Sequence, residues 1–318
     1  MAKPERGTVL VTGATGRVGK HLINALLERG ERVRVLVLDF DPAPKNTEVV
    51  RGSLLNKEAV AEAVKGVDVI YHLAAVLDYT APKKHMFEIN VTGTKNLVEA
   101  SQARKLIYLS STAVYGYGSN FSITESTPCA PSGYYGKTKL MAEKLVLAKH
   151  GIVIRSPDIF GKGFREGYDY VLLHLKKASM PIIGRGTNRI HWIHISDLVQ
   201  ALLLAQERGR PGEIYLVAGK EAKSQKELFT LLTKYLGVKP PSGHIPTFAA
   251  SAMAYYGLLV SRIKGSKPKV LPEHIKKITS DRVFDISKAR RELGFEPKVE
   301  YDAAAKELVD EHLMLSAE

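Results

Sequence analysis

Tyr135 and Lys139 stand four positions apart, a spacing that could place a phenol beside a fixed positive charge. The stretch 135–149 has a helical pattern, and residues four apart on a helix share one face. The Lys139 ammonium would then favour ionisation of the Tyr135 phenol, whose ordinary pKa is about 10. A phenolate near neutral pH can take the proton of an alcohol. The pair therefore indicates proton transfer at a hydroxyl or carbonyl group.

Three hydroxyl side chains, Ser110, Ser111 and Thr112, follow the apolar run 106–109. Such a run is typical of a strand that is buried on both faces of a parallel sheet. Ligands of open α/β sheets bind at the carboxyl ends of the strands. We therefore expect these hydroxyls to lie at the edge of the sheet where a substrate would bind.

A glycine-rich turn stands near the start of the chain, between an apolar strand at 7–12 and an amphipathic helix. Gly13 permits the tight turn, Gly16 lets the backbone approach a phosphate, and Gly19 lets the helix pack closely on the strand. The helix N-terminus would face the anion. A second strand, 32–38, ends at Asp39, where a carboxylate can accept hydrogen bonds from ribose hydroxyls. This turn predicts a dinucleotide site.

Strand and helix patterns alternate through the first half of the chain. Strands are expected near Val9, Val35, Val69, Ile107 and Ile154, and helices over 57–64, 87–103 and 135–149. Alternation of this kind predicts an α/β fold with a doubly wound parallel sheet of the Rossmann type. After 155 the pattern becomes irregular and then mainly helical, which predicts a smaller C-terminal substrate domain. We expect residues 1–155 plus 189–218 to bind the dinucleotide, and residues 156–188 plus 219–318 to form the substrate-binding domain.

Together these motifs give the chain a clear resemblance to the extended short-chain dehydrogenase/reductase (extended SDR) superfamily, the NAD-dependent epimerase/dehydratase family. The glycine run matches the family's TGxxGxxG, and Ser111 and Tyr135-x-x-x-Lys139 match its Ser, Tyr and Lys. The resemblance covers nearly the whole chain. Further matching blocks are His72-Leu73-Ala74-Ala75, Asn90-Val91-Thr92-Gly93-Thr94 and 285–295.

The resemblance implies a role for each matching position. Tyr135 would be the general acid/base, Ser111 would hold the substrate oxygen, and Lys139 would lower the Tyr135 pKa and bond the nicotinamide ribose. Thr112 would contact substrate together with Ser111 and Tyr135. The implied cofactor contacts are Gly13, Thr15, Gly16, Arg17, Val18, Gly19, Asp39, Ser53, Leu54, Ala74, Ala75, Tyr135, Lys139 and Pro157. The resemblance also implies a homodimer, formed through the helices expected at 87–103 and 135–149.

The residues that end the second strand favour NAD over NADP. Relatives that use NADP carry an Arg there for the 2′-phosphate, whereas this chain has Leu38 followed by Asp39, and a carboxylate repels a phosphate. Arg17 in the glycine turn keeps NADP open as the less favoured cofactor. At the third strand the family usually has Asp after Gly, but this chain has Ser53 and Leu54, so the contact with adenine is weaker or is made by the backbone.

The substrate is less clearly indicated than the cofactor. Thr112-Ala113 replaces the Asp-Glu acid/base pair of sugar-nucleotide dehydratases, which argues against water elimination. The Arg-x-x-Asp nucleotide clamp of sugar-nucleotide epimerases falls on Ile275 and Ile278. The apolar stretch 245–263 resembles the hydrophobic segment of 3β-hydroxysteroid dehydrogenases and dihydroflavonol reductases. It could be a core or dimer helix, a substrate lid, or a helix that touches acidic membranes peripherally.

Three functions therefore stay open. The first is an NAD-dependent oxidoreductase that transfers hydride between a secondary alcohol or ketone and nicotinamide, the substrate being a hydrophobic 3β-hydroxysteroid- or isoprenoid-like alcohol. The second is an NDP-sugar (UDP-hexose) 4-epimerase. The third is a non-catalytic NAD(P)-sensing protein, against which the intact Ser111, Tyr135 and Lys139 argue.

The composition indicates a globular protein in a reducing compartment. The chain has 318 residues, 45% of them hydrophobic, and a formal net charge of +13. A lone cysteine, Cys129, excludes an internal disulfide, and Cys and His residues lack metal-ligand spacing, so we expect no metal. The short polar start carries no export signal, so we expect a cytoplasmic protein that acts on a small molecule. The basic residues are scattered without interleaved aromatics, so we expect no nucleic acid partner.

Overall fold

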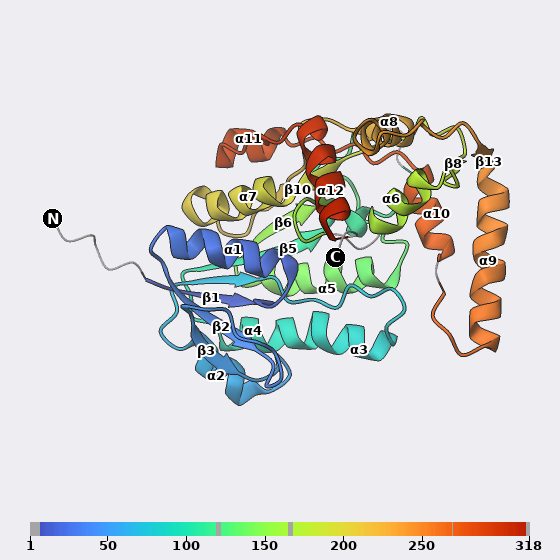
Figure 1. Ribbon diagram of the computed structural model, residues 1–318. Coiled ribbons are helices and arrows are strands. Elements are labelled where there is room, and N and C mark those ends of the chain that lie inside the picture. Colours follow the sequence, from blue (N-terminus) through green and yellow to red (C-terminus); the bar gives the residue numbers. More distant parts are fainter. Residues whose placement is uncertain (1–6, 119–121, 165–167, 269, 316–318) are drawn as a thin grey trace.

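The computed structural model describes residues 7–118, 122–164, 168–268 and 270–315. Within these ranges, seven parallel strands form one sheet in the order β11-β6-β5-β4-β1-β2-β3, flanked by helices on both faces (Figure 1). The expected doubly wound α/β fold is confirmed. The strands of this sheet are β1 Thr8–Thr12, β2 Arg32–Val37, β3 Glu48–Arg51, β4 Val69–His72, β5 Lys105–Ser111, β6 Ile152–Ser156 and β11 Ile214–Leu216.

The helices of this part of the chain follow the strands in alternation, because parallel neighbours need a crossover connection. On one face of the sheet lie α1, α7 and α11, and on the other lie α2, α4 and α5. Their bounds are α1 Arg17–Glu28, α2 Lys57–Val64, α3 Lys83–Phe87, the π-helical η1 Glu88–Gly93, α4 Thr94–Ala100, the 3₁₀ turn η2 Thr112–Tyr115, α5 Tyr134–Leu147, α7 Ile195–Arg208 and α11 Ser287–Leu293.

Each face of the sheet has its own apolar core. Leu22 and Ile23 of α1 and Leu198 of α7 pack with Val9 and Val11 on one face. On the other face, side chains of α2, α4 and α5 pack on Leu10 and its neighbours. The inner strands are therefore buried on both sides, as their continuous apolar runs predicted.

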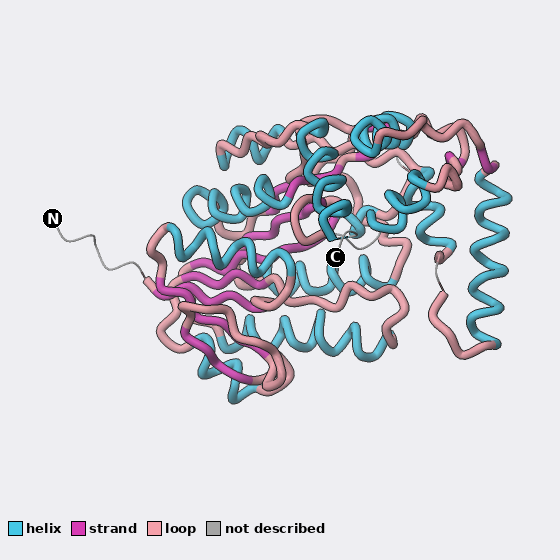
Figure 2. Tube along the Cα trace, in the orientation of Figure 1, coloured by secondary structure: helices cyan, strands magenta, loops and turns pink. Residues whose placement is uncertain are grey.

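The remaining elements form the smaller, mainly helical part that lies beyond the carboxyl edge of the sheet (Figure 2). Its apolar core joins α6, α8 and α12 through Leu172, Phe229, Leu232 and Val309. The elements are β7 Asp158–Phe160, α6 Tyr168–Lys176, β8 Ile182–Ile183, β9 Arg189–Ile190, β10 Trp192–His194, β12 Lys223–Ser224, α8 Gln225–Leu236, β13 His244–Ile245, α9 Thr247–Ile263, α10 Pro272–Thr279 and α12 Tyr301–Leu315.

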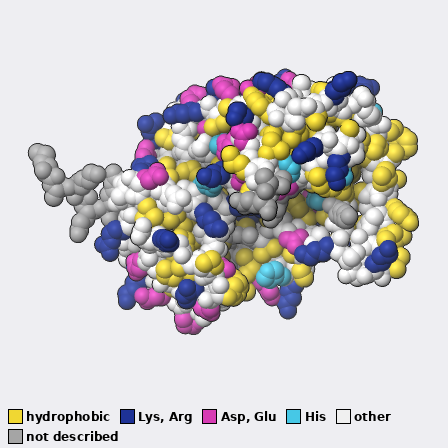
Figure 3. Space-filling model, in the orientation of Figure 1, with side chains coloured by type: hydrophobic (Ala, Val, Ile, Leu, Met, Phe, Trp, Pro, Cys, Tyr) yellow, Lys and Arg dark blue, Asp and Glu magenta, His cyan; other side chains and the backbone are white. Residues whose placement is uncertain are grey.

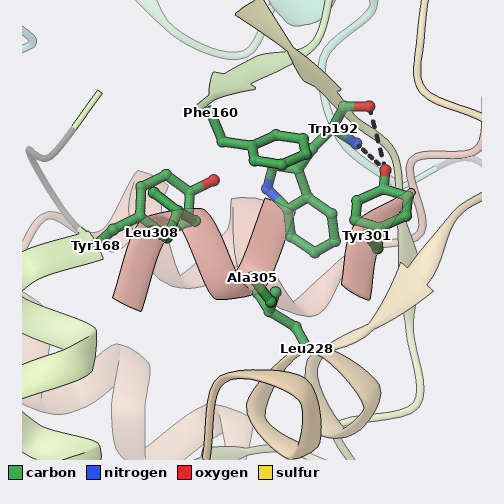
Figure 4. A pocket seen from close by; sticks show the side chains of 7 residues that line it. All are labelled: Phe160, Tyr168, Trp192, Leu228, Tyr301, Ala305 and Leu308. Carbon is green, nitrogen blue, oxygen red and sulfur yellow. Dashed lines mark hydrogen bonds between the residues drawn. The ribbon is translucent and has the colours of Figure 1, made fainter. Parts of the chain in front are cut away.

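An aromatic pocket lies within this smaller part, between β7, β10, α6, α8 and α12 (Figure 4). The Tyr301 hydroxyl donates to the Trp192 carbonyl and accepts from its N–H, both at 3.2 Å. The open volume of about 10 Å³ holds one water at most, so the pocket is packing rather than a substrate site. Its lining residues are Phe160, Tyr168, Trp192, Leu228, Tyr301, Ala305 and Leu308.

Three local features differ from expectation. The helix expected over 87–103 begins at Lys83, ends at Ala100, and contains the π-helical segment. The strand β3 has an exposed or half-buried edge and lacks the apolar run that marks the inner strands. Residues 284–295, which we expected in the substrate domain, place Ile286, Leu293 and Phe295 in the sheet core. The division into two domains stays a prediction.

A buried ion pair holds α5 against the sheet. Glu143 on α5 accepts from Arg155 on β6 at 3.0 and 2.7 Å, and Ser110 on β5 donates to the same carboxylate at 2.5 Å. Arg155 also donates to the Tyr115 hydroxyl at 2.8 Å. The Arg155 and Glu143 side chains are 4% and 1% exposed, so each charge depends on the other for compensation.

Replacing Glu143 should therefore destabilise the fold strongly. The Glu143→Leu variant leaves the Arg155 guanidinium buried without its carboxylate, which should cost about 3–5 kcal/mol of unfolding free energy. The matched control is Glu99→Leu, which breaks the exposed Lys95–Glu99 pair on α4 and should change stability little. Urea unfolding measures both. A Glu143→Leu variant as stable as the control would contradict this account of the pair.

Candidate active site

The glycine turn forms a cradle at the amino end of α1. Gly13 has φ +72°, which favours glycine, and a Cβ there would lie 2.7 Å from the Ala74 backbone nitrogen. A Cβ on Gly19 would clash with the Gly13 carbonyl oxygen. Exposed Gly16 caps α1 and leaves the first helical N–H groups open to an anion. This backbone fits a dinucleotide pyrophosphate, as the sequence predicted.

The predicted adenosine end of the site lies at the tips of β2 and β3. Asp39 follows β2 and is exposed, and the Arg51 guanidinium donates to the Leu38 and Asp39 carbonyls at 3.1 and 2.9 Å. Thr15 donates to Asp41 at 3.1 Å. Arg51 thus fixes the backbone that carries Asp39, leaving that carboxylate on the surface. The arrangement fits ribose hydroxyls rather than a 2′-phosphate.

The other predicted cofactor positions also lie at the carboxyl edge of the sheet. Ala74 and Ala75 follow β4, Ser53 and Leu54 follow β3, and Pro157 follows β6. Among them Leu54 and Pro157 are buried, and Ala75 is exposed. Arg17 and Val18 are half-buried in the first turn of α1, where the Arg17 guanidinium lies 5.2 Å from the Phe164 ring. Their contacts with a cofactor stay predictions.

Ser111, Tyr135 and Lys139 meet where β5 ends and α5 begins. The Ser111 side chain hydrogen-bonds Tyr135 and also accepts from the Ala113 N–H at 3.2 Å. Lys139 lies one helical turn beyond Tyr135, and its ammonium donates to the Leu109 carbonyl at 2.6 Å. The same ammonium lies 4.1 Å from the Tyr108 ring centroid. Thr112 is buried in the turn η2 that follows Ser111.

The pKa values in this group differ from what the spacing predicted. Burial raises the pKa of Tyr135 above its ordinary value, although the hydrogen bond from Ser111 opposes this rise. Burial lowers the pKa of Lys139 to about 7, while the Glu143 carboxylate acts to raise it. The expected lowering of the Tyr135 pKa by Lys139 is therefore not seen. The reason is that both groups are desolvated and that the ammonium donates to the Leu109 carbonyl.

Asp158 is a charged residue of this region that the sequence analysis missed. It starts β7 directly after Pro157 and accepts from Lys277 of α10 at 2.5 Å and from Arg282 at 3.0 Å. Burial alone would raise the pKa of Asp158, but the two cations outweigh it and hold that pKa well below the usual range. Asp158 in turn acts to raise the Tyr135 pKa.

One face of α10 lies opposite Tyr135, with Tyr79 between them. His274 contacts the Tyr79 ring, whose centroid lies 5.6 Å away, and Tyr79 contacts Tyr135 at 5.9 Å. Glu273, on the same helix, accepts from the Tyr117 hydroxyl at 3.3 Å. Aromatic rings and paired charges therefore wall the space beside Tyr135. A second, open hollow of about 650 Å³ lies elsewhere, among residues 175–181 and 239–243.

The sheet and its glycine cradle define the class of dinucleotide-binding α/β proteins. Within that class, the model of the NAD dependent epimerase/dehydratase family matches residues 9–218. The chain belongs to this family, and the resemblance stated from its motifs is confirmed. It is an enzyme, an NAD-dependent oxidoreductase of the epimerase/dehydratase type, and its cofactor is NAD.

Known proteins resemble the chain over nearly its whole length. A 3 beta-hydroxysteroid dehydrogenase/Delta 5-->4-isomerase of Mycobacterium tuberculosis is 30% identical, over 92% of this chain and 87% of its own. A 4-hydroxy-2-methyl-3-oxo-4-farnesyl-3,4-dihydroquinoline-1-oxide ketoreductase of Stigmatella aurantiaca is 28% identical, over 91% and 92%. The structure of UDP-glucuronic acid 4-epimerase from Bacillus cereus with NAD has a TM-score of 0.78 at 22% identity, over 97% and 99%.

The Asp158 ion pairs should hold α10 in place beside Tyr135. In the Asp158→Asn variant, amide hydrogen exchange across residues 272–282 should speed up roughly tenfold, because α10 loses its charged attachment to β7. Lys277→Met should give a similar increase. The control Asp302→Asn removes the exposed Lys234–Asp302 pair and should leave α10 unchanged. Equal exchange in α10 for Asp158→Asn and the control would show that the pairs do not hold it.

Proposed function

We propose that the chain oxidises a secondary alcohol, or reduces the matching ketone, on a large apolar carbon skeleton of the 3β-hydroxysteroid or isoprenoid kind. The observation that carries this proposal is the Ser111–Tyr135 hydrogen bond at the sheet edge, beside a wall of aromatic rings. Aromatic rings suit a hydrophobic skeleton, and the hydroxyl pair suits one oxygen on it. Relatives named for a steroid and for a farnesyl quinoline substrate support this class.

We assign the proton transfer to Tyr135. In reduction, its phenol donates a proton to the substrate oxygen as the ketone becomes an alcohol, and in oxidation the phenolate takes that proton back. Ser111 donates to the same oxygen and orients it. Because burial raises the Tyr135 pKa, the phenol is protonated at neutral pH, which is the form that reduction requires. When bound, the nicotinamide supplies or accepts the hydride at the substrate carbon.

We propose that the glycine turn and the residues near it make the remaining contacts with the cofactor. Gly13, Gly16 and Gly19 would hold the pyrophosphate, Asp39 the ribose hydroxyls, and Lys139 the nicotinamide ribose. Position 38 is Leu rather than the Arg that would bind a 2′-phosphate, which supports NAD over NADP. We propose Thr112 as a further substrate contact.

The epimerase alternative receives less support from the same site. The position that matches the clamp arginine, Ile275, is 5% exposed and packs with Ala250 and Ala254 of α9. An apolar side chain turned toward α9 offers no charge to a nucleotide diphosphate. The apolar alcohol is therefore the better supported substrate.

We further propose that the enzyme acts as a homodimer in the cytoplasm and that residues 245–263 touch a membrane peripherally. The helices expected at the dimer interface, α4 and α5, pack side by side on the outer face, where Met141 is 42% exposed. A lone Cys129 without a disulfide suits a reducing compartment. In the part of the chain that the structure describes, no helix is long and apolar enough to cross a membrane.

Removing the Tyr135 hydroxyl tests the catalytic assignment. With a 3β-hydroxysteroid and NAD⁺, formation of NADH should fall about 10²–10⁴-fold in Tyr135→Phe, because the proton acceptor is lost. The control Tyr134→Phe changes the neighbouring ring on the same helix and should keep nearly full activity. Binding of NAD, followed by fluorescence, should be similar in both. Unchanged turnover in Tyr135→Phe would overturn the assignment.

The nucleotide carried by the purified protein separates the two reaction types. A dehydrogenase releases NADH in each turnover, so denaturing the freshly purified protein should release well under one NAD per chain by mass spectrometry. Added NAD should then bind reversibly. One tightly held NAD per chain would instead favour an epimerase, which regenerates its cofactor in place.

A further inference from the structure

The helix α9 presents an apolar face that the other described residues of the chain leave uncovered. Its buried positions are Ala250 and Ala254, which pack on Ile183, Ile245 and Ile275. The opposite face carries large apolar side chains that are 56–79% exposed, apart from the smaller Ala252. We call this face the α9 stripe, and it consists of Phe248, Ala252, Tyr255, Tyr256, Leu259 and Ile263.

The spacing of the α9 stripe makes it continuous. Its members are separated by four, three, one, three and four positions, so they follow one side of the helix over its whole length. Figure 3 shows these apolar atoms along the edge where Figure 1 places α9, at the side of the molecule away from α1 and α7. A continuous apolar face of this size on a surface helix marks an interaction site.

The charge around the α9 stripe indicates the partner. Residues 228–272 contain six Lys and Arg but neither Asp nor Glu, although the whole chain has 33 acidic residues. Arg262 stands three positions after Leu259, at the edge of the stripe, and Lys264 follows the helix; both are exposed. Of these six, Lys234 is paired with Asp302 and Lys267 with Asp78, so the basic charge beside the stripe comes from Arg262 and Lys264. The surface is therefore apolar and basic at once, which matches the headgroup region of an anionic bilayer.

A second copy of the chain matches this surface less well. An α9–α9 contact would cover the apolar stripe, but residues 228–272 bring no carboxylate to pair with Arg262 and Lys264. Long basic side chains can instead extend from an apolar face toward lipid phosphates. At 17 residues, α9 is about 25 Å long, so it would lie in the plane of the interface rather than cross the bilayer.

We propose that α9 docks on an anionic lipid surface, with its stripe among the headgroups and Arg262 and Lys264 on lipid phosphates. This deepens the proposed membrane contact by naming the lipid charge and the residues. The benefit of docking rests on the proposed function. The helix α10 packs on α9 and faces Tyr135 through Tyr79, so docking would bring the substrate site close to apolar alcohols dissolved in the bilayer.

Vesicle co-sedimentation tests this proposal with the full chain. The vesicles are pure phosphatidylcholine, or phosphatidylcholine with a third of phosphatidylglycerol. Wild type should bind the anionic vesicles and bind the neutral ones far less. Tyr255→Ser/Leu259→Ser should reduce binding at least about tenfold, because two large apolar side chains no longer leave water. Arg262→Gln/Lys264→Gln should reduce it about 30-fold.

The matched control is Lys57→Gln/Lys65→Gln, which removes the same charge from exposed positions at the ends of α2. It should bind like wild type, and melting curves should show that all variants stay folded. An equal loss in this control would mean that binding reflects net charge alone and would overturn the proposal. The proposal would also be overturned if the wild type did not bind the anionic vesicles, or if it self-associated through the α9 stripe. The assay measures no turnover, so its failure is distinct from that of the Tyr135→Phe experiment.

Discussion

The arrangement of Ser111 and Tyr135 at the carboxyl edge of the sheet depends on the buried ion pair between Glu143 and Arg155. The pair joins α5 to β6, and Ser110 adds β5 to the same carboxylate. Because this region excludes water, either charge would be left buried and uncompensated if the two side chains separated. Ser111 is the neighbour of Ser110, and Tyr135 lies on the helix of Glu143, so the pair fixes both ends of the Ser111–Tyr135 hydrogen bond.

The substrate side is attached in a different physical way. The helix α10 meets the sheet edge through the partly buried ion pairs of Asp158 and through ring contacts of Tyr79 rather than through a shared apolar core. Such contacts are weaker and more adaptable than those of a close-packed interior. The cofactor cradle is thus built on rigid backbone, whereas the wall opposite Tyr135 belongs to the part of the chain where specificity can change without disturbing the sheet.

Local sequence patterns predicted most of the fold and the residues that meet at the centre of the candidate site. The glycine turn, the run before Ser111 and the Tyr135–Lys139 spacing each depend on neighbours in sequence, and the helix 57–64 was predicted to the residue. The Asp158–Lys277 pair could not be predicted this way, since the partners stand 119 positions apart. The pKa values of Tyr135 and Lys139 also depend on burial, which spacing does not encode. The exposure of α9 depends on what packs against it, and an apolar run fits a core helix equally well.

The three residues Tyr135, Lys139 and Glu143 occupy successive turns on one face of α5, and they contact Tyr79, the Leu109 carbonyl and Arg155 respectively. Each added or removed residue would turn all that follows by about 100° around the helix axis. Insertions or deletions between these positions would therefore separate Tyr135 and Lys139 from the ion pair that anchors α5.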